Sequence, residues 1–146
     1  MGADVEARVR RSFARQEYMT AIGAELVHVA PGEVDIALAF SERLTQQDGY
    51  LHAGVVAGAA DSACGYAALT TMDADAEVLT VEFKINLLAP AAGERLVARG
   101  RVLRTGRTLT VCRGDAVAIS GGGEKHVATL TATLIAITRG GSDLPS

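Results

Sequence analysis

Residues 46–66 read QQDGYLHAGVVAGAADSACGY, and this stretch decides how the rest of the chain can fold. Its first part is polar and cannot bury enough apolar surface to pack, so residues 41–52 are predicted to form a loop. Small apolar residues dominate from Ala53 onward. Glycines inside a helix each cost about 1 kcal/mol relative to alanine, a loss tolerated where close packing or function requires it. We therefore expect one long buried helix, ending near residues 73–75, that a sheet wraps closely.

Strand patterns lie on both sides of this helix. Before it, residues 26–30 and 34–40 flank a Pro31-Gly32 turn, and apolar residues alternate in the second run. After it come four further strand patterns, at residues 78–88, 94–103, 109–119 and 127–137. A doubly wound parallel sheet fits poorly, because only one helix separates strands. The sequence predicts an α+β fold with six largely antiparallel strands, the last four forming a meander.

The chain is predicted to form one domain. Its 146 residues are enough for a single core, so we assign residues 1–146 to one domain with its core at about 19–138. Apolar residues recur at helical spacing in residues 4–18, which predicts a short amphipathic N-terminal helix. The tail at residues 140–146 is expected to be disordered.

Composition and charge limit the possible partners. A formal charge of -3 provides no broad basic surface, which argues against nucleic acid and favours a small molecule. Residues 53–72 contain a single charged residue, but three glycines and a central acid favour a buried helix over a membrane span. Two cysteines without a signal peptide suggest reduced thiols. Cys64 and Cys112 are therefore predicted to fill the core of a cytoplasmic protein.

Asp61 is the residue that a buried helix does not explain. Burying an ionised carboxylate costs several kcal/mol unless it is paired or hydrogen-bonded, and no Lys, Arg or His lies one turn away. Asp61 must therefore face a polar cavity or a partner element. It is either a structural carboxylate, bonded to backbone amides at solvent or at a subunit interface, or a functional one.

His52, Ala53 and Gly54 stand where the long helix begins. The first N–H groups of a helix have no partner within it, and the helix dipole adds positive potential there. Such a terminus can hold a carbonyl oxygen that becomes negative during acyl transfer. A structural role for His52 is compatible with this, since it can anchor the loop while the amides act on a substrate.

The stretch at residues 46–66 resembles the phenylacetate-pathway type of hotdog-fold acyl-CoA thioesterase, in the 4-hydroxybenzoyl-CoA thioesterase-like superfamily. The signature of that type is Asn or Gln, five residues, His-Gly-Gly, and an acid nine positions after the His. Gln46, His52 and Asp61 satisfy this spacing. The similarity extends over about residues 19–138, including LTVEFKINLLAP at residues 79–90. The resemblance implies a hotdog fold, in which the sheet wraps a long central helix.

The roles in that family carry over residue by residue. The resemblance implies that Asp61 is the nucleophile or the general base, that Gln46 holds the thioester or water, and that Thr80 orients the attacking water. The backbone N–H after the His forms the oxyanion hole, and that residue is Ala53 where Gly is usual, so its methyl group narrows the approach. With Gly54 as a second amide, the implied reaction is hydrolysis of an acyl-CoA thioester to free acid and CoA. CoA is then part of the substrate, and no other cofactor is expected.

Helix geometry predicts that two chains build this site. Ala53 and Asp61 are eight residues apart, which is about 12 Å along an α-helix. A reacting atom must lie roughly 3 Å from both the carboxylate and the oxyanion donors. Two antiparallel helices in a homodimer would satisfy this, with Gln46 and Ala53 from one subunit and Asp61 and Thr80 from the other. We expect a dimer or a dimer of dimers.

Weaker signals concern the rest of the substrate. A basic turn at residues 104–107 suits the phosphates of CoA, although an ordinary solvated hairpin turn has the same composition. The predicted substrate-binding residues are His52, Arg104, Gly106 and Arg107. The glycine run at residues 121–123 lacks the spacing of a phosphate loop and predicts a hairpin turn. His28 and His126 show no metal-ligand spacing, so no metal site is expected.

Two other functions remain open from the sequence. One is a non-catalytic acyl-CoA-binding hotdog module, in which Asp61 only satisfies a subunit interface. The other is a hotdog hydratase or dehydratase, which would need a His and an acid that cooperate at the carbon chain. No His lies close to Asp61 in the sequence.

Overall fold

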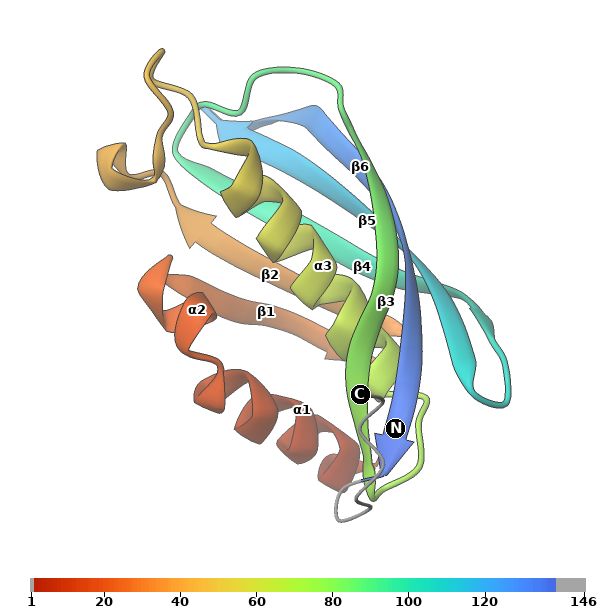
Figure 1. Ribbon diagram of the computed structural model, residues 1–146. Coiled ribbons are helices and arrows are strands. Elements are labelled where there is room, and N and C mark those ends of the chain that lie inside the picture. The colour runs from red at the N-terminus through yellow and green to blue at the C-terminus, as the bar shows by residue number, and fades with distance from the viewer. Residues whose placement is uncertain (1, 139–146) are drawn as a thin grey trace.

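The computed structural model describes residues 2–138 and shows one long helix packed against the concave face of a curved sheet (Figure 1). The predicted disordered tail at residues 140–146 lies outside the described residues. The helices are α1 (Ala3–Arg15), α2 (Glu17–Ala21), the 3-10 helix η1 (Glu42–Leu44) and α3 (Ala53–Leu69). The strands are β1 (Ala24–Ala30), β2 (Glu33–Ala39), β3 (Ala76–Leu87), β4 (Arg95–Thr105), β5 (Leu109–Ser120) and β6 (Gly123–Thr138).

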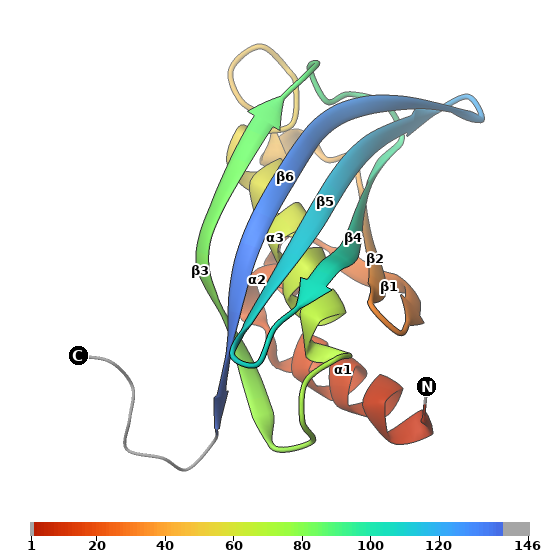
Figure 2. The same ribbon diagram turned by 90° about the vertical axis from the view of Figure 1, so that its right-hand side faces the viewer.

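All neighbouring strands of the sheet are antiparallel, in the order β1-β2-β4-β5-β6-β3. Figures 1 and 2 show the sheet curling around α3, with α1 and α2 beside β1. The prediction of a hotdog fold is therefore confirmed. The four-strand meander is wrong, because β3 pairs with β6 at the far edge and not with β4. Both edges of β4 are taken by β2 and β5, so β3 pairs with the other edge of β6.

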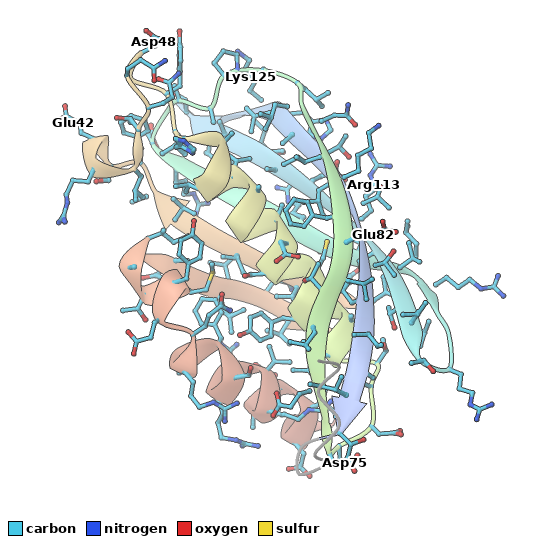
Figure 3. All side chains as sticks on the ribbon, viewed as in Figure 1. Glu42, Asp48, Asp75, Glu82, Arg113 and Lys125 are labelled. Carbon is cyan, nitrogen blue, oxygen red and sulfur yellow. The ribbon has the colours of Figure 1, made fainter. Side chains whose placement is uncertain are left out.

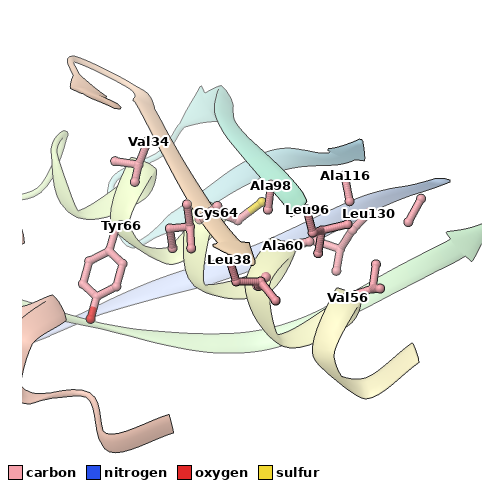
Figure 4. Close-up of a cluster of buried hydrophobic side chains, with 14 of the residues drawn as sticks. Val34, Leu38, Val56, Ala60, Cys64, Tyr66, Leu96, Ala98, Ala116 and Leu130 are labelled. Carbon is pink, nitrogen blue, oxygen red and sulfur yellow. The ribbon is translucent and has the colours of Figure 1, made fainter. Parts of the chain in front are cut away.

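Figure 3 gives the direction of α3 in the molecule, since Asp48 and Asp75 lie in the loops before and after it, at opposite ends. Buried side chains of the sheet surround the helix between these ends. Figure 4 shows Ala60 and Cys64 of α3 among Leu38, Leu96 and Leu130 from three strands. Both cysteines of the chain are fully buried, as predicted for core residues.

Glycines on the sheet let α3 lie unusually close to it. A Cβ atom added at Gly100 of β4 would meet the backbone nitrogen of Cys64 at 2.7 Å. One added at Gly114 of β5 would meet Cys64 Sγ at 2.9 Å and Ala60 O at 3.1 Å. Because backbone atoms of a packed helix cannot move aside independently, Gly100 must lack a side chain, and a side chain at Gly114 would force Cys64 and α3 to shift. The sequence predicted close wrapping from the glycines of the helix, and the sheet supplies the matching half.

Within α3, the glycines differ in what they allow. A Cβ at Gly58 would meet Tyr18 Cε1 of α2 at 2.6 Å, so this glycine makes room for α2. A Cβ at Gly65 would make only ordinary contact, 3.5 Å from Leu134. Close packing therefore explains Gly58 but does not require Gly65.

The long helix ends earlier than predicted, at Leu69 and not near residues 73–75. The hydroxyl groups of Thr70 and Thr71 donate to the carbonyls of Ala67 and Ala68, at 2.7 and 2.8 Å. In addition, the guanidinium of Arg8 donates to Leu69 O at 2.7 Å and to Met72 O at 3.1 Å. These donors satisfy the last carbonyls of α3, so the chain can leave the helix there.

The N-terminal helix also ends before its predicted limit of residue 18. Gln16 takes an extended conformation, with φ -83° and ψ 101°, and divides the segment into α1 and α2. The apolar residues at helical spacing end with Phe13 and Ala14, and polar residues follow at 15–17, so the pattern did not support a helix extended to residue 18.

Candidate active site

Asp61 lies in the middle of α3, and Thr80 of β3 holds its carboxylate. Thr80 Oγ1 donates to Asp61 Oδ1 at 2.7 Å. Burial raises the pKa of Asp61 above its ordinary value, while the hydrogen bond from Thr80 lowers it, and burial is the larger cause. The carboxylate lines a cavity of about 240 Å³ that also exposes Gln16, Ser62 and Tyr66. Asp61 was predicted to face a polar cavity or a partner element, and within one chain it lines such a cavity.

His52 caps the N-terminus of α3. Its side chain accepts a hydrogen bond at Nδ1 from the Gly54 N–H, at 2.8 Å. The backbone N–H of His52 donates to Leu44 O at 2.9 Å, and this bond attaches the end of the loop to η1. His52 therefore anchors the loop. The expected second amide is not free, because the Gly54 N–H that was predicted to polarise a substrate is already bonded to this ring.

The Ala53 N–H is the amide that stays available at this terminus. Ala53 is exposed, and within residues 2–138 its N–H has no hydrogen-bond acceptor. His52 precedes it in an extended conformation, with φ -59° and ψ 139°, which points the first amide out of the helix end. The helix dipole adds positive potential at this N–H. The arrangement can bind a carbonyl oxygen that gains negative charge.

Gln46 organises the loop before the helix. Its Oε1 accepts hydrogen bonds from the N–H groups of Asp48, at 2.6 Å, and Tyr50, at 3.3 Å. Its backbone N–H donates to Tyr50 O at 2.8 Å. The oxygen of the carboxamide is thus used inside the loop, and its nitrogen is the group that remains for a substrate.

Gln46 and Ala53 share a second cavity, which is separate from that of Asp61. This cavity has a volume of about 370 Å³, and most of its walls are apolar, including Val56 and Leu87. Neither Asp61 nor Thr80 lines it, and neither Gln46 nor Ala53 lines the cavity of Asp61. One chain therefore does not bring the predicted catalytic residues to a single cavity.

The basic turn lies away from both of these groups within one chain. Gly106 and Arg107 line a cavity of about 330 Å³ together with Thr71 and Met72, which follow the C-terminal end of α3. Arg104 is exposed near the end of β4. Gly106 has a structural role here, because its N–H donates to Leu109 O at 2.7 Å and closes the hairpin.

Three polar residues beside Asp61 were not identified from the sequence. Gln16, Ser62 and Tyr66 form a hydrogen-bonded cluster that lines the Asp61 cavity. Ser62 and Tyr66 are one turn apart on α3, and that spacing was the available signal. Gln16 lay within the predicted N-terminal helix, residues 4–18, and the sequence gave no signal for its role.

Other titratable groups have local explanations. His28 and Glu33 are 2.9 Å apart, and His126 and Asp115 are 2.8 Å apart, both as side-chain pairs. Burial raises the pKa of the Cys112 thiol to about 12, so it stays protonated. Over residues 2–138, no three His, Cys, Asp or Glu side chains gather in a way that could hold a metal ion. In the same part of the chain, no helix is long and apolar enough to cross a membrane.

A curved antiparallel sheet around a long helix defines a class of protein, the hotdog domain, and here the helix carries a central carboxylate and an open first amide. Sequence comparison agrees with this class. Residues 48–125 match the family described as the Thioesterase superfamily. The chain therefore belongs to the thioesterase superfamily, a family of enzymes that hydrolyse thioesters.

Individual relatives give the extent of the similarity. An esterase-named protein from Saccharolobus solfataricus is 34% identical over 90 residues, which cover 62% of this chain and 64% of that protein. This chain thus matches less than two thirds of that relative's length. A 1,4-dihydroxy-2-naphthoyl-CoA hydrolase from Listeria monocytogenes is 30% identical over 90 residues, covering 62% and 73% of the two chains. A thioesterase family protein from Silicibacter pomeroyi is 49% identical, with a TM-score of 0.90 over 92% of this chain and 98% of that one.

Proposed function

We propose that this protein hydrolyses an acyl-CoA thioester to a free acid and CoA, as a thioesterase of the phenylacetate-pathway type. The observation that carries the proposal is the Asp61 carboxylate, held by Thr80 in a polar cavity on an otherwise apolar helix. The open Ala53 N–H supplies the complementary oxyanion donor. The relative that hydrolyses an aromatic CoA ester supports a CoA thioester as the substrate.

The site is completed by a second copy of the chain, paired through β3. This strand has a free edge, and large apolar side chains on and next to it are between 44% and 55% exposed: Leu79, Val81, Phe83, Leu87 and Leu88. A long, apolar, unpaired edge strand is a surface for pairing with another chain. An antiparallel pair centred on Phe83 places Glu82 opposite Lys84 of the partner subunit, and the reverse, so the edge is complementary to itself.

This pairing brings the two halves of the site together. Because α3 lies beside β3 and is bonded to it through Asp61 and Thr80, a twofold axis at the β3 edge sets the two α3 helices antiparallel. Ala53 of one copy then approaches Asp61 of the other. Two separate cavities in each chain, one with the amide and one with the carboxylate, are what such a shared site requires. Association of two dimers stays a prediction.

The chemical step uses the carboxylate as a base or as a nucleophile. In the first case, Asp61 takes a proton from water, the resulting hydroxide adds to the thioester carbon, and the oxyanion is bound by the Ala53 N–H. When this tetrahedral intermediate collapses, the C–S bond breaks, and the CoA thiolate takes the proton that Asp61 removed from water. In the second case, the carboxylate attacks the thioester carbon, the C–S bond breaks and the CoA thiolate leaves. Water then hydrolyses the mixed anhydride, which releases the acid, restores the Asp61 carboxylate and supplies the proton that the thiolate takes. In either case the proposal assigns the Gln46 amide nitrogen to hold the thioester or the water, since the amide oxygen is bonded within the loop.

The remaining predicted residues act on the rest of the substrate. Because the partner α3 runs in the opposite direction, its C-terminal end and its basic turn lie beyond the N-terminus of the first α3. Arg104 and Arg107 of the chain that supplies Asp61 are then near the opening of the site. The part of bound CoA that carries the phosphates extends out of the site at this opening. His52 lies at this opening and fixes the loop that carries Gln46.

The variant Asp61→Asn tests the proposal, because it removes the basic oxygen with little change in volume. Release of free thiol from short-chain, long-chain and aryl acyl-CoAs is expected to fall at least about 100-fold, the lower range for a general base. Asp4→Asn, at an exposed position of α1, is the matched control and should retain full activity. Activity of Asp61→Asn within threefold of the wild type would refute the assignment of Asp61 as the catalytic carboxylate.

The same panel separates the alternatives. A binding module would be stabilised against unfolding by acyl-CoA without any release of CoA. A hydratase would change the absorbance of an enoyl-CoA without releasing thiol. Light scattering or sedimentation gives the mass in solution, and a monomer would contradict the shared site.

A further inference from the structure

Helix α1 is interrupted at one residue only, and that residue points its side chain at the catalytic cavity. Gln16 is extended between helical residues on both sides. Its N–H donates to Phe13 O at 3.0 Å, so the break leaves the backbone N–H satisfied. The N-terminal segment lies outside the residues that match the thioesterase family. The family match therefore does not cover the break.

The carboxamide of Gln16 joins two hydroxyl groups of α3. Gln16 Oε1 accepts from Ser62 Oγ at 3.2 Å, and Gln16 Nε2 donates to Tyr66 Oη at 3.0 Å. Ser12 Oγ donates to the same phenol oxygen at 3.4 Å. The ring of Tyr66 is 5% exposed and packs against Phe13, with 5.8 Å between the ring centroids. The cluster is therefore held in place from both helices.

This cluster forms one wall of the Asp61 cavity. The wall of the 240 Å³ cavity that faces α1 is formed by polar residues of the cluster: Ser12, Gln16, Ser62 and Tyr66. Thr80 lies beside the Asp61 carboxylate. The second cavity, at Ala53, is lined mainly by apolar side chains. The two ends of the site thus differ in chemistry. A cavity of about 150 Å³ is enough for a benzene molecule, so 240 Å³ has room for a compact acyl group.

We propose that Gln16, together with Ser62 and Tyr66, determines acyl specificity by selecting a compact acyl group with a hydrogen-bonding far end over an alkyl chain. The inference rests on the proposed thioesterase function, since it places the acyl group on the α1 side of Asp61. A hydroxyl at the end of the acyl group exchanges its bonds to water for bonds to this cluster. An alkyl end of the same size displaces water from these polar groups and returns no hydrogen bond, and such a mismatch is penalised in the transition state.

The test compares two acyl-CoAs that differ by one hydroxyl group, hexanoyl-CoA and 6-hydroxyhexanoyl-CoA, with dodecanoyl-CoA for length. In the wild type, kcat/KM is expected to be about tenfold higher for the hydroxylated substrate, the value of one hydrogen bond. Dodecanoyl-CoA is expected to be the poorest of the three. Gln16→Leu keeps the volume and removes the bonds, so the ratio should fall to about one.

Tyr66→Phe should lower the ratio in the same way while keeping the ring that contacts Phe13. Tyr18→Phe is its matched control, because that phenol donates to Gly54 O and does not line the Asp61 cavity, and the ratio should stay at the wild-type value. Thermal unfolding of each variant shows that it is folded.

A wild-type ratio within twofold of one, or a ratio that Gln16→Leu leaves unchanged, overturns the assignment of Gln16 while hydrolysis itself remains. Absence of thiol release from all three substrates, and from an aryl acyl-CoA, overturns the proposed function and the specificity with it.

Discussion

Replacing Ala53 with proline is expected to delete the oxyanion donor without breaking α3. Ala53 is the first helical residue, and proline is well tolerated there because that N–H has no partner within the helix. The residue before a proline must be extended, and His52 already is, with φ -59° and ψ 139°. The cap from His52 Nδ1 to the Gly54 N–H does not involve the deleted group.

The expected loss follows from the role of one amide. Removing a single oxyanion-hole donor typically lowers the rate by about 10² to 10³-fold. Ala53→Gly, which keeps the N–H, is the matched control and should stay near the wild-type rate. If Ala53→Pro is folded and retains activity within threefold, this amide is not the donor.

Combining this variant with Asp61→Asn tests whether the site is shared. In a heterodimer of Ala53→Pro and Asp61→Asn chains, one site contains the intact Ala53 of the second chain and the intact Asp61 of the first. The other site carries both defects. The heterodimer should therefore have about half of the wild-type activity, although each variant alone is almost inactive. Co-expression with two different affinity tags isolates it, and thiol release measures it. Activity no higher than that of the separate variants would refute a site built from two chains.

Three further variants test the supporting structure. Thr80→Val removes the hydrogen bond that lowers the pKa of Asp61, so this pKa rises further. The acid limb of the pH profile of kcat/KM should therefore move to higher pH, and an unchanged acid limb would contradict this role of Thr80. Gly100→Ala forces a methyl group onto the backbone of α3 and should lower the free energy of unfolding in urea by about 3 kcal/mol. Gly123→Ala is the control, because its added Cβ would make only an ordinary contact at 3.6 Å, and it should change stability little. Equal effects of the two variants would refute the close approach of β4 to α3. Arg8→Met removes the donors to the C-terminal carbonyls of α3 and should cost about 2 kcal/mol, and a loss below 0.5 kcal/mol would mean that water replaces them.

Much of the fold could be predicted from the sequence because its elements are locally encoded. The strand patterns lie within a few residues of the strands observed. The prediction that residues 52–54 form the N-terminus of the long helix is confirmed, since α3 begins at Ala53. The position of Asp61 on an apolar helix also follows from the sequence, since helical spacing fixes what surrounds it. That local reading identified the carboxylate and the cavity it required.

The predictions that failed involve contacts between distant segments. At the end of α3, Leu69 O is bound by Arg8, which is 61 residues away in the sequence. At the break between α1 and α2, Gln16 accepts a hydrogen bond from Ser62, which is 46 residues away. The occupation of the Gly54 amide by His52 is local, but it depends on the orientation of a ring that residue order does not give.

The sequence by itself determined the types of the elements, the buried helix and the acid on it, because hydrophobic periodicity and burial energies act over a few neighbouring residues. Only the tertiary structure decided that β3 takes the free edge of β6, that Thr80 reaches Asp61 and that Gln16 closes the carboxylate cavity. Strand patterns of similar length and character can pair in several orders, and the order is chosen by how the whole sheet closes around α3. The chemistry of the site depends on that closure, since it sets which polar groups surround the carboxylate.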